Sequence, residues 1–241
     1  MLSIILPAYN EQDLIIHTLR EIEQFLIDGS RRGEVIVVDD GSNDATAEKV
    51  EAWISNYHGN TDYCLLKNEE NRGKGFSVRR GMQKAAGENH LFMDADLPFD
   101  LRAINRIIEN LNGDFDVAIG NRNDPGSKLT SITVLRKIAG RVFILLVQIV
   151  VQENISDTQC GLKAFTKEAS HIIFSRGTID GFGFDAELLR IAQKHNMRIA
   201  RVPVVMLENR KQSRVRLLQD SLKMFGNIFT IMINDMTGKY N

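Results

Sequence analysis

Two aspartates, Asp94 and Asp96, close the apolar stretch "LFMDADLP". Side chains two residues apart on an extended segment point to the same side, so the two carboxylates would lie close together. Each negative charge opposes ionisation of the other. A divalent cation would relieve this repulsion, and hard oxygen ligands favour Mg²⁺ or Mn²⁺. Two carboxylates are few for such a metal, so we expect a nucleotide diphosphate to complete its coordination; a surface turn with two solvated acids is the alternative.

A second acidic pair, Asp39 and Asp40, ends the aliphatic stretch "EVIVVDD". A carboxylate at the end of a strand can accept hydrogen bonds from ribose hydroxyls, as in dinucleotide-binding folds. We therefore expect Asp39, and secondarily Asp40, to bind the base or ribose. The alternative is that Asp40, Ser42 and Asn43 form a turn and cap the following helix.

Three basic residues are candidates for binding phosphate. Lys74 lies in "NRGKG", which resembles a phosphate loop but lacks the complete spacing of a P-loop or of G-x-G-x-x-G. Arg122 follows an aliphatic run, and Arg136 begins a long apolar segment. A guanidinium can bind phosphate through two parallel hydrogen bonds. A charge on the surface of a helix is the alternative for Arg136.

Aliphatic runs alternate with segments of helical periodicity in the first half of the chain. This alternation predicts an α/β fold with a mostly parallel sheet and helices on both faces. Ligands bind beyond the carboxyl ends of the strands in such sheets, which is where the polar motifs lie. We expect strands at 3–7, 34–40, 62–67, 90–96 and 115–122, and helices at 13–27, 44–57, 75–86 and 100–111.

The second half is less regular and contains neither an internal repeat nor a linker rich in proline or serine. We expect a single domain over residues 1–241, with a nucleotide-binding half at 1–125 and an acceptor half at 126–241 that carries interfacial helices. The patterns predict helices at 130–153, 181–196 and 213–235, and strands within 157–165 and 198–208.

Composition limits the class of protein. The net charge of −1 gives no reason to expect a nucleic-acid partner. Cys64 and Cys160 match no metal-binding spacing, which favours a reducing compartment. The first residues do not resemble a signal peptide. The longest apolar run, 142–151, is about half the ~20 residues of a membrane span, so we expect no transmembrane helix.

Taken together, "PAYNE", "VVDDGS", "NRGKG" and "DAD" resemble the family 2 glycosyltransferases of the GT-A fold. "IGNR", "DTQCGLKAF" and "GFDAELL" are similar to the polyprenyl-phosphate branch, which contains the dolichyl-phosphate mannose and glucose synthases, and "DTQCGLK" is most similar to the dolichyl-phosphate beta-glucosyltransferases. The resemblance covers about residues 2–215. It implies a Rossmann-like sheet and an inverting, metal-dependent hexosyltransferase. The donor would be a nucleotide-diphosphate sugar, with UDP-glucose favoured over GDP-mannose, and the acceptor a polyprenyl or dolichyl phosphate.

The resemblance also implies roles for individual residues. Asp96 would be the main metal ligand, and Asp94 would lie beside the metal and the sugar nucleotide. Asp157 would orient the acceptor or act as a weak base, with a cap before "TQCG" as the alternative. Pro98 stands where some mannose synthases carry a metal-binding glutamine. Base and ribose would be framed by Pro7, Tyr9, Glu11 and Asp39, and the acceptor phosphate would be bound by Arg122, Arg136, Arg210 and Arg214.

Asp185 and Glu187 form a further candidate pair, with an ordinary acidic helix N-terminus as the alternative. A lipid acceptor also requires a membrane surface. The basic and apolar segment 133–152 has the composition of an interfacial helix, and a buried helix is the alternative. The apolar stretch 224–233 would lie on a membrane or in an oligomer interface. We expect a cytoplasmic protein, peripheral on the cytoplasmic face of a membrane, with an anchoring partner or a second copy of itself.

Two other functions stay open. A family 2 transferase with a soluble saccharide acceptor would keep the fold and donor, but "DTQCGLK" and the interfacial helix argue against it. A nucleotide-sugar-binding protein without turnover would have no need of two repelling carboxylates. A dinucleotide dehydrogenase is disfavoured because G-x-G-x-x-G is absent after the first strand. The sequence does not distinguish UDP from GDP or glucose from mannose, and it leaves open the lipid, the oligomeric state and the use of a general base.

Overall fold

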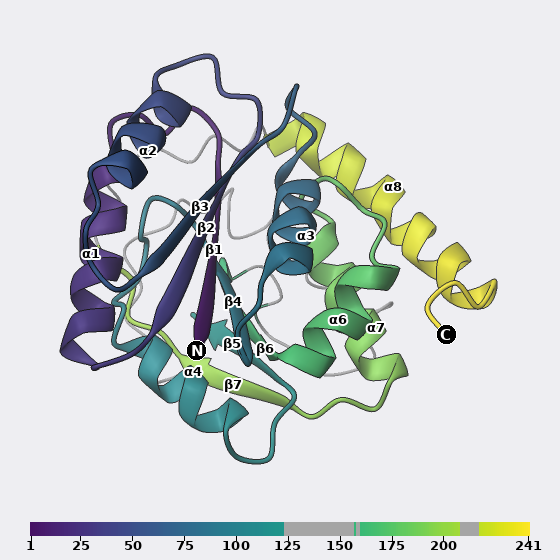
Figure 1. Cartoon of the computed structure of the whole chain (residues 1–241). Helices are drawn as coiled ribbons and strands as arrows, with labels where there is room; N and C mark the ends of the chain where they lie inside the picture. Colours follow the sequence, from purple (N-terminus) through teal and green to yellow (C-terminus); the bar gives the residue numbers. More distant parts are fainter. Residues whose placement is uncertain (123–156, 158–159, 208–216) are drawn as a thin grey trace.

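The computed structural model describes residues 1–122, 157, 160–207 and 217–241. Its strands form one seven-stranded sheet in the order β3-β2-β1-β4-β6-β5-β7 (Figure 1). The strands are β1 (Leu2–Ala8), β2 (Gly33–Asp39), β3 (Asp62–Lys67), β4 (Asn89–Met93), β5 (Val117–Asn121), β6 (Leu162–Thr166) and β7 (Ile199–Pro203).

The first four strands pair in parallel, with β1 between β2 and β4. β6 is antiparallel to both β4 and β5, and β7 is parallel to β5. Strands from both halves of the chain therefore share one sheet. The five strands expected in the first half are confirmed, except that β4 ends at Met93, so Asp94 and Asp96 lie in a turn and not on the extended strand. β1 and β2 are almost wholly buried, as continuous aliphatic runs predict.

Helices cover both faces of the sheet (Figure 1). One buried apolar cluster joins the sheet to α1, α2 and α4, and another joins it to α3, α6, α7 and α8. The helices are α1 (Ile15–Asp28), α2 (Thr46–Ser55), α3 (Lys74–Lys84), α4 (Ala103–Leu111), α6 (Lys167–Arg176), α7 (Phe184–Lys194) and α8 (Leu217–Met236).

The main differences from the sequence-based expectations are local. The structure contains α6, which the periodicity did not predict. Ser42 and Asn43 do not cap α2, whose N-cap is Ala45 without a side-chain bond. Instead, the backbone N–H of Thr46 donates to the Asp44 carboxylate at 3.0 Å. The helix expected at 130–153 lies outside the described residues.

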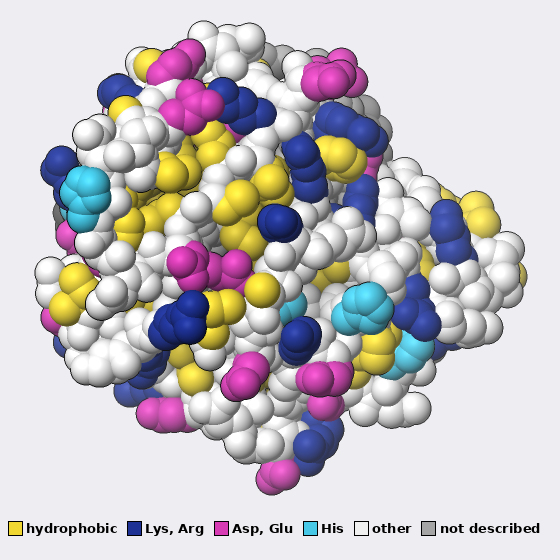
Figure 2. Space-filling model, in the orientation of Figure 1, with side chains coloured by type: hydrophobic (Ala, Val, Ile, Leu, Met, Phe, Trp, Pro, Cys, Tyr) yellow, Lys and Arg dark blue, Asp and Glu magenta, His cyan; other side chains and the backbone are white. Residues whose placement is uncertain are grey.

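Neither sign of charge dominates the face shown in Figure 2, where acidic and basic side chains are interspersed. This fits a net charge of −1. Among the helices that the structure describes, we find none with the length and hydropathy required to cross a bilayer.

Candidate active site

The DAD segment forms a tight turn directly after β4. Leu97 has a φ of 47°, a left-handed conformation that residues other than glycine rarely adopt. Its backbone N–H donates to the carbonyl of Asp94 at 3.3 Å. The Thr18 hydroxyl donates to the Ala95 carbonyl at 2.6 Å and ties the turn to α1. Asp94 and Asp96 are therefore held, half-buried, at the carboxyl edge of the sheet.

Asp94 lies against two elements from different parts of the chain. Its carboxylate is 2.5 Å from the ammonium of Lys74, the first residue of α3. A Cβ placed on Gly161 would lie 1.9 Å from an Asp94 oxygen, so a side chain there would displace the Asp94 carboxylate. Gly161 precedes β6, and sequence reasoning did not assign it a role although "DTQCG" was singled out.

The electrostatics of this edge fit a divalent cation. Burial, the Asp94 carboxylate and the Glu11 carboxylate together raise the pKa of Asp96. Burial alone would lower the pKa of Lys74, but the carboxylates of Asp94 and Asp185 raise it. Within the described ranges, no group of three acidic, histidine or cysteine side chains is assembled as a complete metal site. The role of Asp94 and Asp96 as ligands of Mg²⁺ or Mn²⁺ remains a prediction.

The ends of β1 and β2 place the predicted nucleotide-binding residues side by side. Ala8 pairs with Asp39 in the register of these strands, next to Pro7 and Val38. Ser42 donates to Asp39 through its hydroxyl, and through its backbone N–H at 3.2 Å. The Ser42 hydroxyl accepts from the backbone N–H of Asn10 at 2.9 Å.

Glu11 is fixed in the same loop, because its backbone N–H donates to Thr46 at 2.8 Å. Tyr9 lies between Ala8 and Asn10 in this loop and is half-buried. The geometry therefore brings Pro7, Tyr9, Glu11 and Asp39 together, and their roles toward a nucleotide remain predictions.

Asp40 has a structural task that neither reading of the sequence anticipated. One carboxylate oxygen accepts from the Asn68 side chain at 2.7 Å and from the backbone N–H of Arg72 at 3.0 Å. The other accepts from the backbone N–H of Gly73 at 2.8 Å. Asp40 thus holds the "NRGKG" loop and places Lys74 beside Asp94. Its direct contact with a nucleotide remains a prediction.

The glycines of "NRGKG" are required by a close backbone approach. A Cβ on Gly73 would lie 2.6 Å from the Asp180 carbonyl oxygen, and one on Gly75 would lie 2.5 Å from that of Ile179. Gly73 also has a φ of 103°. The segment that approaches, residues 177–183 between α6 and α7, is hereafter the 177–183 loop.

Arg122 and Asp157 form a pair beside β5. The Arg122 side chain makes two contacts of 2.8 Å with the two carboxylate oxygens, and its backbone N–H adds one of 2.9 Å. Burial alone would raise the pKa of Asp157, but Arg122 lowers it. A carboxylate of lowered pKa is a weak proton acceptor at neutral pH. The Arg122 side chain is still 36% exposed, so part of it is open to a ligand. Arg136, Arg210 and Arg214 lie outside the described residues.

A buried ion pair between Lys163 and Asp185 lies next to the site. Lys163, fully buried in β6, donates to the Cys160 carbonyl at 2.8 Å and is 2.5 Å from Asp185. Asp185 and Glu187 do not form a pair, since Glu187 binds the 177–183 loop instead. Sequence reasoning missed Lys163, although "GLKAF" carries it.

The family sequence model named "Glycosyl transferase family 2" matches residues 3–174. The chain belongs to this family. It is 36% identical to a dolichyl-phosphate beta-glucosyltransferase of Dictyostelium discoideum, over 84% of this chain and 65% of the relative. It is 33% identical to one from Drosophila melanogaster, over 99% and 76%, and 32% identical to one from Homo sapiens, over 84% and 66%. The chain thus spans roughly two thirds to three quarters of the length of these relatives.

Solved structures share its GT-A fold. Mannosyl-3-phosphoglycerate synthase from Rubrobacter xylanophilus superposes with a TM-score of 0.72 at 17% identity, over 99% of this chain and 75% of that one. Glucosyl-3-phosphoglycerate synthase from Mycobacterium tuberculosis, in complex with Mn²⁺, UDP-glucose and phosphoglyceric acid, gives 0.70 at 18% identity, over 96% and 79%. At these identities the likeness establishes the fold alone, and with it the expected α/β architecture.

Proposed function

We propose that the chain is an inverting, metal-dependent glycosyltransferase that moves glucose from UDP-glucose to a polyprenyl or dolichyl phosphate. The observation that carries the proposal is the half-buried Asp94 and Asp96 pair, held beside Lys74 at the carboxyl edge of the sheet. The dolichyl-phosphate beta-glucosyltransferases that it resembles supply the substrate class.

The residues at this edge divide the work of donor binding. Asp96 and Asp94 would hold Mg²⁺ or Mn²⁺, which supplies positive charge to the leaving diphosphate when bound. Lys74 contributes a second cation from the start of α3. Asp39, held by Ser42, accepts hydrogen bonds from the base or ribose. These groups are fixed before the donor arrives, so little reorganisation is needed during the reaction.

The acceptor requires cations more than it requires a base. A phosphate monoester has a second pKa of about 6, so it is largely dianionic at neutral pH and is already a nucleophile. Arg122 presents a partly exposed side chain, and Asp157 keeps its guanidinium in place. Asp157 is thus better suited to orienting Arg122 than to removing a proton.

This function is tested by pairing two donors with two acceptors. UDP-glucose with dolichyl phosphate should give a glucolipid, and a chelator should abolish product formation. GDP-mannose should react more slowly, and a soluble saccharide should not be glucosylated. Thin-layer chromatography of radiolabelled product measures each combination. Transfer to saccharide but not to lipid would favour the soluble-acceptor transferase, and tight donor binding without any product would favour a binding protein.

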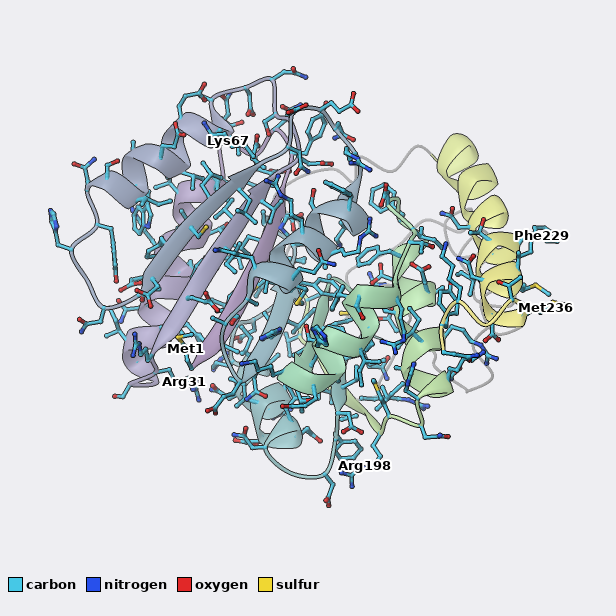
Figure 3. The ribbon with its side chains drawn as sticks, turned by 45° about the vertical axis from the view of Figure 1, so that its right-hand side comes forward. Met1, Arg31, Lys67, Arg198, Phe229 and Met236 are labelled. Carbon is cyan, nitrogen blue, oxygen red and sulfur yellow. The ribbon has the colours of Figure 1, made fainter. Side chains whose placement is uncertain are left out.

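α8 offers a surface for the membrane that such an acceptor requires. Its outward side chains Phe229, Met232, Ile233 and Met236 are 64%, 38%, 60% and 84% exposed and recur at helical spacing. Figure 3 shows Phe229 and Met236 projecting away from the body of the protein. We place this face on the cytoplasmic leaflet because both cysteines are free thiols, which suits a reducing compartment.

Replacing Phe229 and Ile233 by glutamate should weaken membrane binding. Each change removes apolar area from the bilayer and adds a charge that resists insertion, so we expect binding to liposomes to fall about tenfold or more. Co-sedimentation with liposomes measures it. The matched control is Ile27→Glu, since Ile27 is 59% exposed on α1, against the other face of the sheet. If the α8 variant and Ile27→Glu lose liposome binding equally, the membrane-binding surface lies elsewhere. If the α8 variant changes its oligomeric state but still binds liposomes, α8 is a contact between copies of the chain.

A further inference from the structure

The 177–183 loop contacts the start of α3, where Lys74 lies. The backbone N–H of Phe76 donates to the Asp180 carbonyl at 3.1 Å. The Asp180 carboxylate pairs with the guanidinium groups of Arg72, at 3.4 Å, and Arg79. The loop backbone also fills the space that side chains on Gly73 and Gly75 would occupy. A close-packed contact of this kind transmits displacement, so a shift of the loop would move the start of α3.

The opposite side of the loop is held by Glu187 of α7, which is 1% exposed. One carboxylate oxygen accepts from the backbone N–H groups of Thr178 and Ile179, both at 2.9 Å. The other accepts from the hydroxyls of Thr178 and Tyr240, both at 2.8 Å. A buried carboxylate of this kind is tolerated because several donors surround it, and removing one leaves its charge less compensated.

The same network includes the end of α8 and the residues after it. The side-chain amide of Asn234 in α8 donates to the Thr178 hydroxyl at 3.1 Å and to the Tyr240 hydroxyl at 3.2 Å. Tyr240 is fully buried, and its carbonyl lies 2.8 Å from the ring nitrogen of His195. Hydrogen bonds therefore run from α8 through Tyr240 and Glu187 to the loop.

We propose that Glu187 is a positioning residue. Through it, the position of α8 affects the orientation of the Lys74 side chain at the donor site. The inference rests on the proposed function, because it gives Lys74 a contact with the donor. Glu187 is buried and acts through the 177–183 loop. Since Phe229 and Ile233 lie on the outward face of α8, binding there and donor binding become linked and must influence each other equally.

Tyr240→Phe in the full chain tests this coupling, because it removes one hydroxyl and leaves the ring in place. We expect the backbone amide of Phe76 to exchange hydrogen about fivefold faster or more, since it reports directly on the bond to Asp180. We also expect the KM for UDP-glucose to rise about three- to tenfold, with kcat changed less than about twofold. Hydrogen-exchange mass spectrometry and steady-state kinetics measure the two effects.

The matched control is Tyr63→Phe. The Tyr63 hydroxyl likewise donates to a glutamate, Glu23, at 2.8 Å, but it lies on β3 at the far edge of the sheet. This control should change neither quantity. Glu187→Gln keeps the shape and the acceptor for the loop amides, so it should fall between wild type and Tyr240→Phe. If Tyr240→Phe does not fold, Glu187→Gln provides the test in its place.

If the Phe76 amide exchanges at the wild-type rate in both Tyr240→Phe and Glu187→Gln, the proposal is overturned. An equal change of that exchange rate in Tyr63→Phe would also overturn it. Hydrogen exchange requires no substrate. If the wild-type protein transfers no glucose, the proposed function fails, while the exchange of Phe76 still decides whether the coupling exists.

Discussion

Asp96→Asn should lower glucose transfer by about 100- to 1000-fold, because the leaving diphosphate would lose the charge that holds its metal. Asparagine has the same shape as aspartate, so the turn after β4 should be kept. Asp96 lies near two other carboxylates, and burial together with their charges raises its pKa. Removing its charge relieves repulsion, so the metal-free variant should unfold at the wild-type temperature or slightly above it. Kinetics with saturating Mn²⁺ and a thermal melt measure the two effects.

The matched control for this prediction is Asp100→Asn. Asp100 lies four residues further along, but its carboxylate binds the exposed side chain of Arg102. This variant should transfer glucose at nearly the wild-type rate. If Asp96→Asn is as active as wild type with only Mg²⁺ or Mn²⁺ present, Asp96 is not a metal ligand. A large loss of thermal stability would instead assign Asp96 to the fold.

The sequence predicted those site residues that directly follow a strand or lie in the loop after it. Continuous aliphatic runs identified the strands, and the rule that ligands bind at their carboxyl ends placed Asp39, Lys74 and Asp94 at one edge. The structure brings Lys74 onto Asp94 as that rule requires. Local pattern was sufficient here because the first four strands are parallel and all end at the same edge of the sheet, although β3 and β4 are not neighbours in it.

The features that sequence reasoning missed depend on contacts between distant segments. β6 inserts antiparallel between β4 and β5, and this brings Gly161 against Asp94 and Lys163 against Asp185. No local periodicity encodes such a position. Asp40 was assigned to a turn or a ribose, yet it binds backbone amides of a loop more than thirty residues later. A buried carboxylate next to a carboxylate that is predicted to bind a ligand cannot be assigned a task from its residue type alone.

Arg122→Gln should lower transfer to dolichyl phosphate by roughly ten- to a hundredfold, since a charge-assisted contact contributes about 1.5–3 kcal/mol. It should also destabilise the fold by about 3 kcal/mol, because Asp157 would stay buried without its cation. A lower rate of transfer in this single variant could therefore come from lost stability or from a lost contact with the acceptor. The double variant Arg122→Gln with Asp157→Asn separates them, because two neutral amides can bond to each other and leave no buried charge.

We expect the double variant to unfold near the wild-type temperature and still to transfer glucose as poorly as Arg122→Gln. Hydrolysis of UDP-glucose by water should persist in both variants, since Asp96 and Asp39, the proposed metal and nucleotide ligands, are unchanged. Thermal melts, product chromatography and a UDP-release assay measure these quantities. Recovery of transfer together with stability would make Arg122 a structural partner of Asp157. Equal loss of transfer and hydrolysis would place Arg122 at the donor. Loss of transfer alone would leave the acceptor phosphate as the group that its exposed guanidinium binds.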